Sequence, residues 1–383
     1  MYLTREEERM LLGEYGEALA KAMKVLVKVG ESLGAGRLIE ISHAHVSGIS
    51  YFNVGDAGLE FVEDLAKLGA RFSVFTTTNP YAALVDYSGR SPASEVLKKQ
   101  LRIVSALRAM GSKSFTCTPY YVRTPKPGEH LAWAESSAVL YANSVLGAMT
   151  NREPGVLSLL AGIAGRTYLG EAHKGLPEEV RHVVNLEKPK DPSEAGVYGL
   201  LAGKVSPTGI ALVRGIADLP EPYIKEFLAA YAVPSPAHVV ILEGVTPGFS
   251  RVNIAGAERV YIGRSELKEF YRDADSCENP LYLIGCPHLS LKELEQVVSK
   301  VDKVEKGELW ITVGDLISQA EELRRGVKVI AGGCAVTTRL DSLGVDCVIT
   351  DSAKALTYLP KLAGVKAYLM RRDELLRKVV GRG

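Results

Sequence analysis

The chain has 383 residues, of which 46% are hydrophobic and 24% charged, and its formal net charge is +1. This length predicts two or three domains or one large α/β unit, and the composition excludes a chain that is mainly disordered. The balanced charge excludes the basic surface expected of a general nucleic-acid binder. The charged, amphipathic N-terminus lacks the apolar core of a signal peptide, and no apolar run is long enough to span a bilayer. We therefore expect a cytoplasmic protein without a membrane or nucleic-acid partner.

Helical and extended patterns alternate along the N-terminal part of the chain. Thr4 and Glu7 predict a capping box at the start of one long helix that ends near residue 33. The glycine-rich segment 155–170 is either a tightly packed helix or a loop near a ligand. The other expected elements, in chain order, are a strand at 37–42, a helix at 56–69, a strand at 71–78, a helix at 91–111, an extended segment at 113–118 and a helix at 133–149.

The alternation continues after a soft boundary at Pro234 and Pro236, which follow a helix within 220–240. Ser290 and Glu293 predict a second capping box at the start of a helix. Further strands are expected at 238–244, 259–263, 281–286, 308–313, 327–333 and 346–351. The pattern predicts an α/β fold with largely parallel strands, divided into an N-terminal region at 1–235 and a C-terminal region at 236–383.

Chemistry-bearing residues are sparse, because the usual nucleotide-binding, zinc-protease, α/β-hydrolase and C-x-x-C motifs are absent. Three of the five cysteines, Cys117, Cys286 and Cys334, each follow a strand-like run. Ligands bind beyond the carboxyl ends of parallel strands, so these thiols can converge at one site. Three thiolates can hold a cubane iron–sulfur cluster and leave one iron open as a Lewis acid. The alternative is three unrelated buried cysteines.

The remaining cysteines have plainer interpretations. Cys347 lies in an apolar run and is expected to be a core thiol, while Cys277 lies in a polar loop and is expected to be a surface thiol. In a reducing compartment we expect thiols rather than disulfides.

Four polar segments follow strands or open a helix, and each has two interpretations. His43 and His45 can bind a metal or pack as polar side chains, and the segment 47–50 can offer N–H groups to an anion. The segment 76–80 is a ligand loop or an ordinary turn. Glu135 either caps a helix or marks an anion site, and Lys354 either pairs with a phosphate or carboxylate or is solvated at the surface.

Several long blocks of this sequence resemble the aconitase X family. They are T-R-E-E-E-R-M-L-L-G-E-Y-G, H-V-S-G-I-S-Y, V-G-D-A-G-L-E-F, T-C-T-P-Y-Y, A-E-S-S-A-V-L-Y-A-N-S-V-L-G, G-C-P-H-L-S and D-S-A-K. They occur in the family's order between about residue 3 and about residue 360. The resemblance implies an aconitase-like, multi-domain α/β fold with largely parallel sheets around a central cleft. It also implies a hydro-lyase that converts (R)-5-phosphomevalonate, a phosphorylated hydroxy acid, to trans-anhydromevalonate 5-phosphate in the archaeal type of mevalonate pathway.

The resemblance implies site residues as well. It assigns a [4Fe-4S] cluster to Cys117, Cys286 and Cys334, and a substrate pocket to Gly48, Ile49, Ser50, Asn79, Pro80, Glu135, Ser136 and Lys354. Aconitase-like enzymes carry their catalytic base on a swivelling domain, which we do not find after residue 360. We therefore expect a separate small subunit that supplies the base and forms a heterodimer with this chain, whose own residues include no certain catalytic base. Alternatives are a cis-3-hydroxy-L-proline dehydratase of the same family, a non-catalytic iron–sulfur or metal-binding protein, and a metal-free α/β binding protein.

Overall fold

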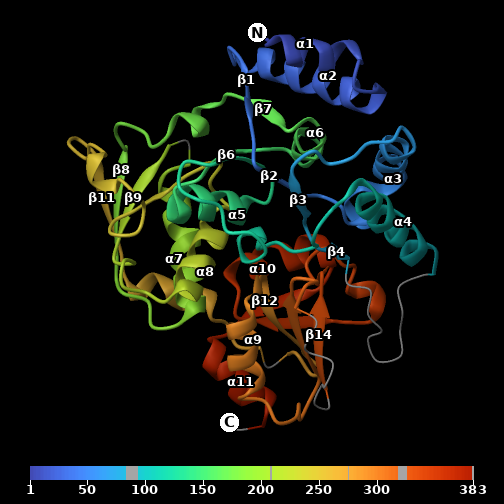
Figure 1. The fold of residues 1–383 in the computed structure, drawn as a ribbon. Coiled ribbons are helices and arrows are strands. Elements are labelled where there is room, and N and C mark those ends of the chain that lie inside the picture. Colours follow the sequence, from blue (N-terminus) through green and yellow to red (C-terminus); the bar gives the residue numbers. More distant parts are fainter. Residues whose placement is uncertain (83–93, 208, 275, 318–325, 382–383) are drawn as a thin grey trace.

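The computed structural model describes residues 1–82, 94–207, 209–274, 276–317 and 326–381. Three parallel sheets follow one another along the chain, each with helices packed beside it (Figure 1). This arrangement confirms the predicted α/β class with largely parallel strands. Among the described residues, no helix is long and apolar enough to cross a membrane.

The N-terminal helical segment consists of two helices, not the single long helix that the sequence predicted. The helix α1 spans Arg5–Leu12 and begins with the predicted capping box of Thr4 and Glu7. Gly13, with φ at 89°, ends α1 in a left-handed conformation that glycine adopts without strain. The helix α2 then spans Glu17–Ser32. The correction has a simple physical cause: the amphipathic pattern continues across a glycine that breaks the backbone.

The first sheet has the strand order β3-β2-β5-β6, and all its pairs are parallel. Its strands are β2 (His43–Val46), β3 (Phe75–Thr78), β5 (His130–Trp133) and β6 (Met149–Arg152). The accompanying helices are α3 (Tyr51–Lys67), α4 (Ser94–Met110), α5 (Ser136–Tyr141) and α6 (Gly155–Ala164). A π-helical turn, Ala142–Leu146, continues α5, and α6 is the packed helix that was one of two interpretations of its segment. A short antiparallel pair, β1 (Leu38–Glu40) with β7 (Arg166–Tyr168), lies beside this sheet.

The second sheet has the order β10-β9-β8-β11 and is also parallel. Its strands are β8 (His182–Leu186), β9 (Ala211–Arg214), β10 (Ile241–Leu242) and β11 (Glu258–Ile262). The proposed boundary at residue 235 lies inside the stretch of chain that builds this sheet. The helices α7 (Pro192–Val205) and α8 (Glu221–Tyr231) pack closely, and the missing side chain of Gly203 permits this approach. A Cβ atom at Gly203 would lie only 2.6 Å from the Tyr231 carbonyl oxygen.

The third sheet has the order β14-β13-β12-β16-β17, again all parallel. Its strands are β12 (Leu281–Leu289), β13 (Glu308–Val313), β14 (Val327–Ala331), β16 (Cys347–Thr350) and β17 (Lys366–Leu369). The helices are α9 (Leu291–Val298), α10 (Ala353–Tyr358) and α11 (Arg372–Val379). The predicted capping box of Ser290 and Glu293 is present at the start of α9.

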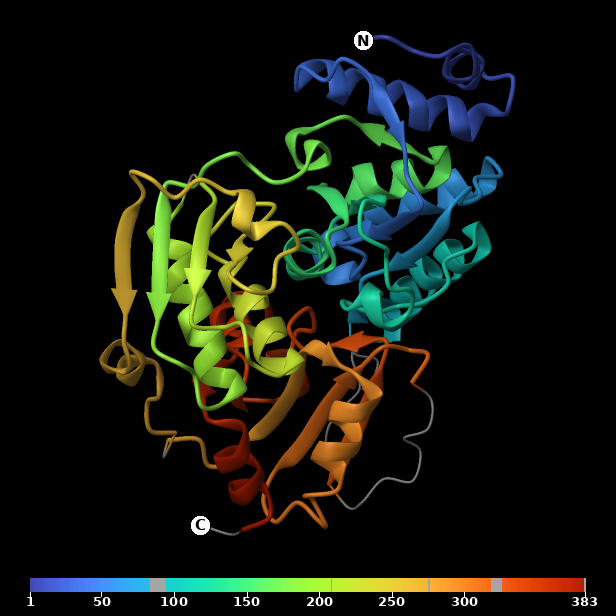
Figure 2. The ribbon, with the colours of Figure 1, turned by 60° about the vertical axis from the view of Figure 1, so that its left-hand side comes forward.

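A short parallel pair connects the first and third sheets. The strand β4 (Tyr81–Ala82) follows the first-sheet strand β3, and it pairs with β15 (Gly333–Cys334), which follows β14. The N-terminal helices and the C-terminus lie at opposite ends of the molecule (Figure 2). The ends of the first-sheet and third-sheet strands therefore meet in the middle of the molecule, where β4 and β15 run side by side.

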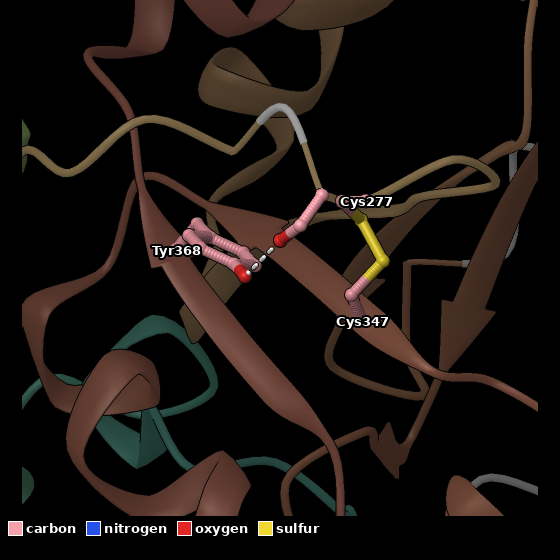
Figure 3. The surroundings of a disulfide bond; sticks show 4 residues. Cys277, Cys347 and Tyr368 are labelled. Atoms are coloured by element: carbon pink, nitrogen blue, oxygen red, sulfur yellow. Dashed lines mark hydrogen bonds between the residues drawn. A yellow bond between two sulfur atoms is a disulfide. The ribbon is translucent and has the colours of Figure 1, made fainter.

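Cys277 and Cys347 form a disulfide, which corrects the prediction that both are free thiols and that Cys277 lies at the surface (Figure 3). Cys347 is buried in the core, as predicted. Their Cα atoms lie 5.9 Å apart although 70 residues separate them in sequence. Cys277 is only 8% exposed, because its loop folds onto the core beside the third sheet, where Ser276 is hydrogen-bonded to Tyr368 at 2.8 Å. The polarity of the loop sequence concealed this burial.

Candidate active site

Two of the three cysteines singled out by their position lie at or just beyond the end of a strand, whereas the strand expected to end at Cys286 continues to Leu289. Cys117 comes two residues after Phe115, which bridges to Thr78 at the end of β3. Cys286 lies within β12, and Cys334 is the last residue of β15. All three are free and partly exposed, and Cys286 and Cys334 pack against the same hydrophobic cluster. The fold therefore brings together thiols that are far apart in sequence.

The three thiols interact electrostatically. Burial raises the pKa of Cys117 to about 12, and nearby Glu135 and Cys334 contribute to the rise. Burial also raises the pKa of Cys286 well above its usual range, with smaller contributions from Cys334 and Cys117. Lys354 acts in the opposite direction on both groups, because its positive charge favours the thiolate. A ligand that binds thiolates here must displace their protons.

His288 connects the cysteine segments, and sequence reasoning did not single it out. Its backbone N–H donates a hydrogen bond to Cys117 Sγ at 3.2 Å. Its ring lies 2.9 Å from the Gly333 carbonyl oxygen through Nε2 and 3.3 Å from Thr116 Oγ1 through Nδ1. Since His288 follows Cys286 by two residues, one side chain fixes all three cysteine segments relative to one another.

The donor set fits an iron–sulfur cluster better than a single metal ion. Among the described residues, no three His, Cys, Asp or Glu side chains come close enough to share one ion. A cluster of several irons holds its thiolates around a larger body, each on a different iron. The N–H bond to Cys117 Sγ is the kind of contact that stabilises a cluster-bound sulfur. Three partly exposed thiols on three converging segments therefore suit a cluster with three protein ligands.

Asn79, Glu135 and Lys354 form a connected polar group beside the cysteines. Lys354 Nζ lies 2.5 Å from Glu135 Oε1, and Asn79 Nδ2 donates to Glu135 Oε2 at 2.8 Å. Ser137 also donates to Glu135 Oε1 at 3.0 Å. Burial would raise the pKa of Glu135, but Lys354 and Asn79 outweigh it and lower that pKa to about 2. Glu135 is therefore ionised and Lys354 charged, and Lys354 is not the solvated surface residue of the plain interpretation.

The other predicted pocket residues lie on neighbouring loops. The backbone N–H of Asn79 donates a hydrogen bond of 2.7 Å to the carbonyl oxygen of Val46, the last residue of β2. This bond places the loop containing Gly48 next to Asn79. Ser50 Oγ donates to the Thr337 carbonyl oxygen at 3.0 Å, three residues after Cys334. Gly48 is exposed with φ at 72°, whereas Ile49 and Pro80 are buried. Ser136 is half-buried in the first turn of α5, where Glu135 caps the helix.

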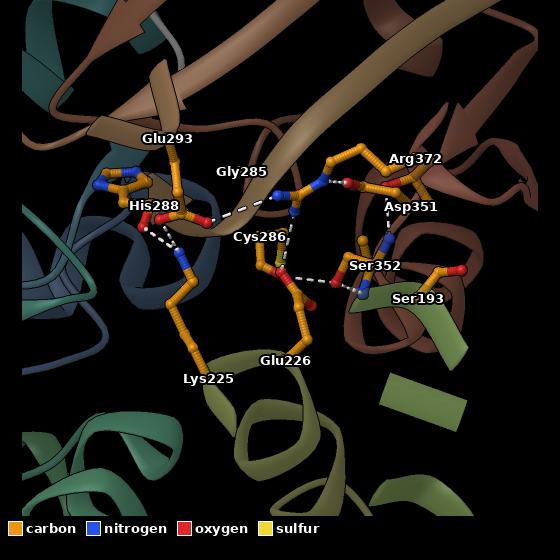
Figure 4. A network of polar contacts seen from close by, with 12 residues as sticks. Ser193, Lys225, Glu226, Gly285, Cys286, His288, Glu293, Asp351, Ser352 and Arg372 are labelled. Carbon is orange, nitrogen blue, oxygen red and sulfur yellow. Dashed lines mark hydrogen bonds and ion pairs between the residues drawn. The ribbon is translucent and has the colours of Figure 1, made fainter. Parts of the chain in front are cut away.

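A network of buried charges lies around Cys286 (Figure 4). Lys225 lies 2.5 Å from Glu293, and Arg372 contacts Asp351 at 2.5 Å and Glu293 at 3.5 Å. Glu226 is fully buried, 3.9 Å from Arg372, and neither of its carboxyl oxygens has a hydrogen-bond partner within the described residues. Burial and the neighbouring Asp351 raise its pKa well above the usual range, so the carboxyl favours its neutral form.

This network connects the helix α8 to the segment that carries Lys354. Asp351 directly follows the third-sheet strand β16, and the next residue, Ser352, donates a hydrogen bond from Oγ to the Cys286 carbonyl oxygen. Ser352 also caps α10, which carries Lys354. Sequence reasoning identified the segment 351–354 but not its partners. They lie 21, 66 and 219 residues away, at Arg372, Cys286 and Glu135, and contacts at such separations leave no local pattern.

Comparisons with known proteins show the family to which the chain is similar. Models of the aconitase X first, second and third domains match residues 1–174, 180–272 and 280–381. The phosphomevalonate dehydratase large subunit of Aeropyrum pernix is 43% identical, over 94% of this chain and 96% of that protein. The protein of the same name from Methanocaldococcus jannaschii is 35% identical, over 98% and 100%. The cis-3-hydroxy-L-proline dehydratase of Pseudomonas aeruginosa is 30% identical, over 94% of this chain but 66% of that protein.

A solved structure shows the same architecture. The crystal structure of Thermococcus kodakaraensis aconitase X in its holo-form superposes with a TM-score of 0.88 at 34% identity, over 99% of this chain and 100% of that one. A holo-form is a protein with its cofactor, so the protein in that crystal carries one.

Proposed function

The chain belongs to the aconitase X family and is a hydro-lyase of the phosphomevalonate dehydratase large-subunit type, and on that premise we propose how its residues work. We propose that it dehydrates (R)-5-phosphomevalonate to trans-anhydromevalonate 5-phosphate. The observation that supports this best is the convergence of three free cysteines beside the Glu135–Lys354 pair. A dehydratase of a hydroxy acid needs a group that activates a hydroxyl and a charged group that holds an anion, and these two features suit those roles.

We propose that this chain acts with a small subunit. Relatives named large subunits are matched over 95% to 100% of their length, whereas the hydroxyproline dehydratases are matched over only 66%. The relatives named large subunits are also the more similar ones, at 35–43% identity against 30–31%, and that name supports a small-subunit partner. We assign the catalytic base to the small subunit, and the cytoplasmic location stays a prediction from the sequence.

We propose a [4Fe-4S] cluster on Cys117, Cys286 and Cys334. When bound, such a cluster supplies an iron without a protein ligand as the Lewis acid for the departing hydroxyl. The fit rests on three thiols with no fourth cysteine among the free ones, and on the N–H bond to Cys117 Sγ. A non-catalytic cluster protein would be expected to have a fourth ligand.

The overall reaction removes water from adjacent carbons. The C2 proton leaves to a base, its electron pair forms the C2–C3 double bond, and the C3–O bond breaks to release hydroxide, which becomes water on protonation. In this chain, Lys354 keeps its positive charge because Glu135 raises its pKa against the effect of burial. We assign Lys354, Asn79 and the loop of Gly48 to binding the substrate's anionic groups, where negative charge increases as C2 loses its proton.

The test is an anaerobic assay of the chain with and without its small subunit, after reconstitution with iron and sulfide. We expect the complex to dehydrate phosphomevalonate and the chain alone to be inactive or nearly so. The same preparation is offered cis-3-hydroxy-L-proline, since relatives at 30–31% identity carry that name. Faster turnover of hydroxyproline would replace the proposed substrate, and full activity of the chain alone would refute the assignment of the base.

A further inference from the structure

A series of buried, hydrogen-bonded polar side chains, here called the hydrogen-bonded series, leads from the first sheet to Glu135. His43 Nε2 lies 3.0 Å from Thr77 Oγ1, and Thr77 Oγ1 lies 2.8 Å from His45 Nδ1. His45 Nε2 lies 2.8 Å from Asn79 Oδ1, and Asn79 in turn donates to Glu135. Neighbouring parallel strands supply these residues, because β2 carries both histidines and β3 carries Thr77.

The last acceptor, the Glu135 carboxylate, determines the direction of every hydrogen bond in the hydrogen-bonded series. An ionised carboxylate only accepts, so the Asn79 amide presents its N–H to Glu135 and its oxygen to His45. His45 must then carry its proton on Nε2 and accept at Nδ1 from the Thr77 hydroxyl. That hydroxyl accepts in turn from His43 Nε2. Every donor therefore points toward Glu135.

The first member of the hydrogen-bonded series, His43, is consistent with this direction. His43 Nδ1, which carries no proton in this arrangement, has no hydrogen-bond partner within the described residues. The His43 ring instead packs edge-on against Phe75 and Trp133, with ring centroids 5.0 Å and 5.1 Å apart. Both histidines and Thr77 are completely buried. Burial lowers the pKa of His45 to about 4, so its ring is neutral, as it must be for Nδ1 to accept a hydrogen bond.

We propose that His45 and Thr77 are positioning residues that fix the orientation of the Asn79 amide and, through it, the carboxylate of Glu135. If the amide turned over, its oxygen would face Glu135 Oε2 and repel it. With the amide held, Asn79 occupies Oε2, and Oε1 is left for Lys354 and Ser137. This role rests on the proposed function only in taking Glu135 and Lys354 as the substrate-facing pair.

The strand β3 offers a matched set of variants. Thr77→Val removes the hydroxyl at nearly constant volume and leaves both histidine nitrogens without it, while Thr77→Ser retains it. Thr76→Val is the control, because Thr76 is equally buried but does not belong to the hydrogen-bonded series. Its hydroxyl donates to the Val74 carbonyl oxygen at 3.0 Å. In the complex with the small subunit, we expect kcat/KM to fall about tenfold or more in Thr77→Val and to stay near wild type in the other two.

A spectroscopic measurement separates positioning from a general loss of structure. The full chain is labelled with nitrogen-15 in its histidine rings, and His45→Gln identifies the His45 signals. We expect the wild type, Thr76→Val and Thr77→Ser to show His45 neutral with its proton on Nε2, and Thr77→Val to show a shifted Nδ1 signal.

A wild-type His45 with its proton on Nδ1 would overturn the proposal, and that measurement needs no variant to fold. Unchanged His45 signals in Thr77→Val would overturn it too, as would a loss of activity in Thr77→Ser equal to that in Thr77→Val. Because the ring signals are read without substrate, they do not depend on phosphomevalonate being the substrate. Failure of the proposed function would appear instead as a complex in which the wild type and all variants are inactive.

Discussion

Lys354 Nζ and Glu135 Oε1 lie 2.5 Å apart although 219 residues separate them in sequence. The pair links the N-terminus of α5, which follows a first-sheet strand, to the N-terminal turn of α10, which follows a third-sheet strand. Each side chain is less than 15% exposed, so each charge depends on the other for its stability. The pair therefore serves both the fold and the proposed anion site, and mutations can separate these roles.

Lys354→Met should leave the Glu135 carboxylate without its partner. We expect the free energy of unfolding to fall by about 3 kcal/mol and turnover by about 100-fold. The double variant Lys354→Met with Glu135→Gln removes both charges and should recover most of the stability but none of the activity. Urea unfolding and the dehydration assay measure the two effects. Recovery of activity in the double variant would show that the Lys354 charge has no role in the reaction.

Serine replacements should separate the cluster cysteines from the disulfide cysteines. We expect Cys117→Ser, Cys286→Ser and Cys334→Ser each to lose most of the iron of the reconstituted protein, together with its absorption near 400 nm. The matched control is Cys277→Ser, which removes a cysteine without touching the candidate site. Iron analysis after anaerobic purification distinguishes the two sets. Equal iron in all four variants would remove these cysteines as ligands.

The disulfide of Cys277 and Cys347 should contribute to stability rather than to catalysis. It closes a loop of 70 residues, and the chain-entropy model gives about 4 kcal/mol for a loop of that length. We expect the double variant Cys277→Ala with Cys347→Ala to unfold at lower urea and to keep its turnover at moderate temperature. A reductant should shift the unfolding midpoint of the wild type but not that of the variant. The stabilising role of the disulfide would be contradicted if the wild-type midpoint equalled that of the variant and did not shift with reductant.

Glu226→Gln should become more stabilising as the pH rises. Burial raises the pKa of Glu226 above its ordinary value of 4.5, so the folded chain holds this proton more tightly than the unfolded chain. As the pH rises from that value toward the raised pKa, the wild type loses stability, and glutamine cannot ionise. We expect the variant and the wild type to be alike near or below pH 4.5 and to diverge in favour of the variant above it.

Urea unfolding across this pH range measures the effect. Exposed Glu295 on α9 supplies the control, since Glu295→Gln should show no such divergence. A constant difference between Glu226→Gln and the wild type at all pH values would mean that folding does not shift the pKa of Glu226, and would contradict this account.

Local pattern predicted the elements that have a strong periodic signal or a capping sequence. The apolar runs of β12, β13, β14 and β16 and the two capping boxes were identified from the sequence alone. The sequence pattern does not predict the strands β8 and β9, because they lie in a stretch rich in glycine and proline. The position of cysteines after strands also singled out Cys117, Cys286 and Cys334 before any family resemblance was considered.

Pairings across long sequence separations could not be predicted in this way. The polar loop sequence around Cys277 gave no sign that Cys347 was its partner. The pattern of His43 and His45 was open between a metal site and polar packing, and only the pairing of β2 with β3 shows that Thr77 bonds to both rings. Such contacts depend on which strands become neighbours, which no single segment specifies.

The most direct test of the central claim is to follow dehydration of phosphomevalonate while iron and sulfide are restored in steps to the anaerobic complex of this chain and its small subunit. If the three free cysteines hold the catalytic cluster, activity rises in proportion to cluster content and stays absent at every step in the Cys286→Ser complex. Equal activity in the iron-free and the fully reconstituted complex would contradict it.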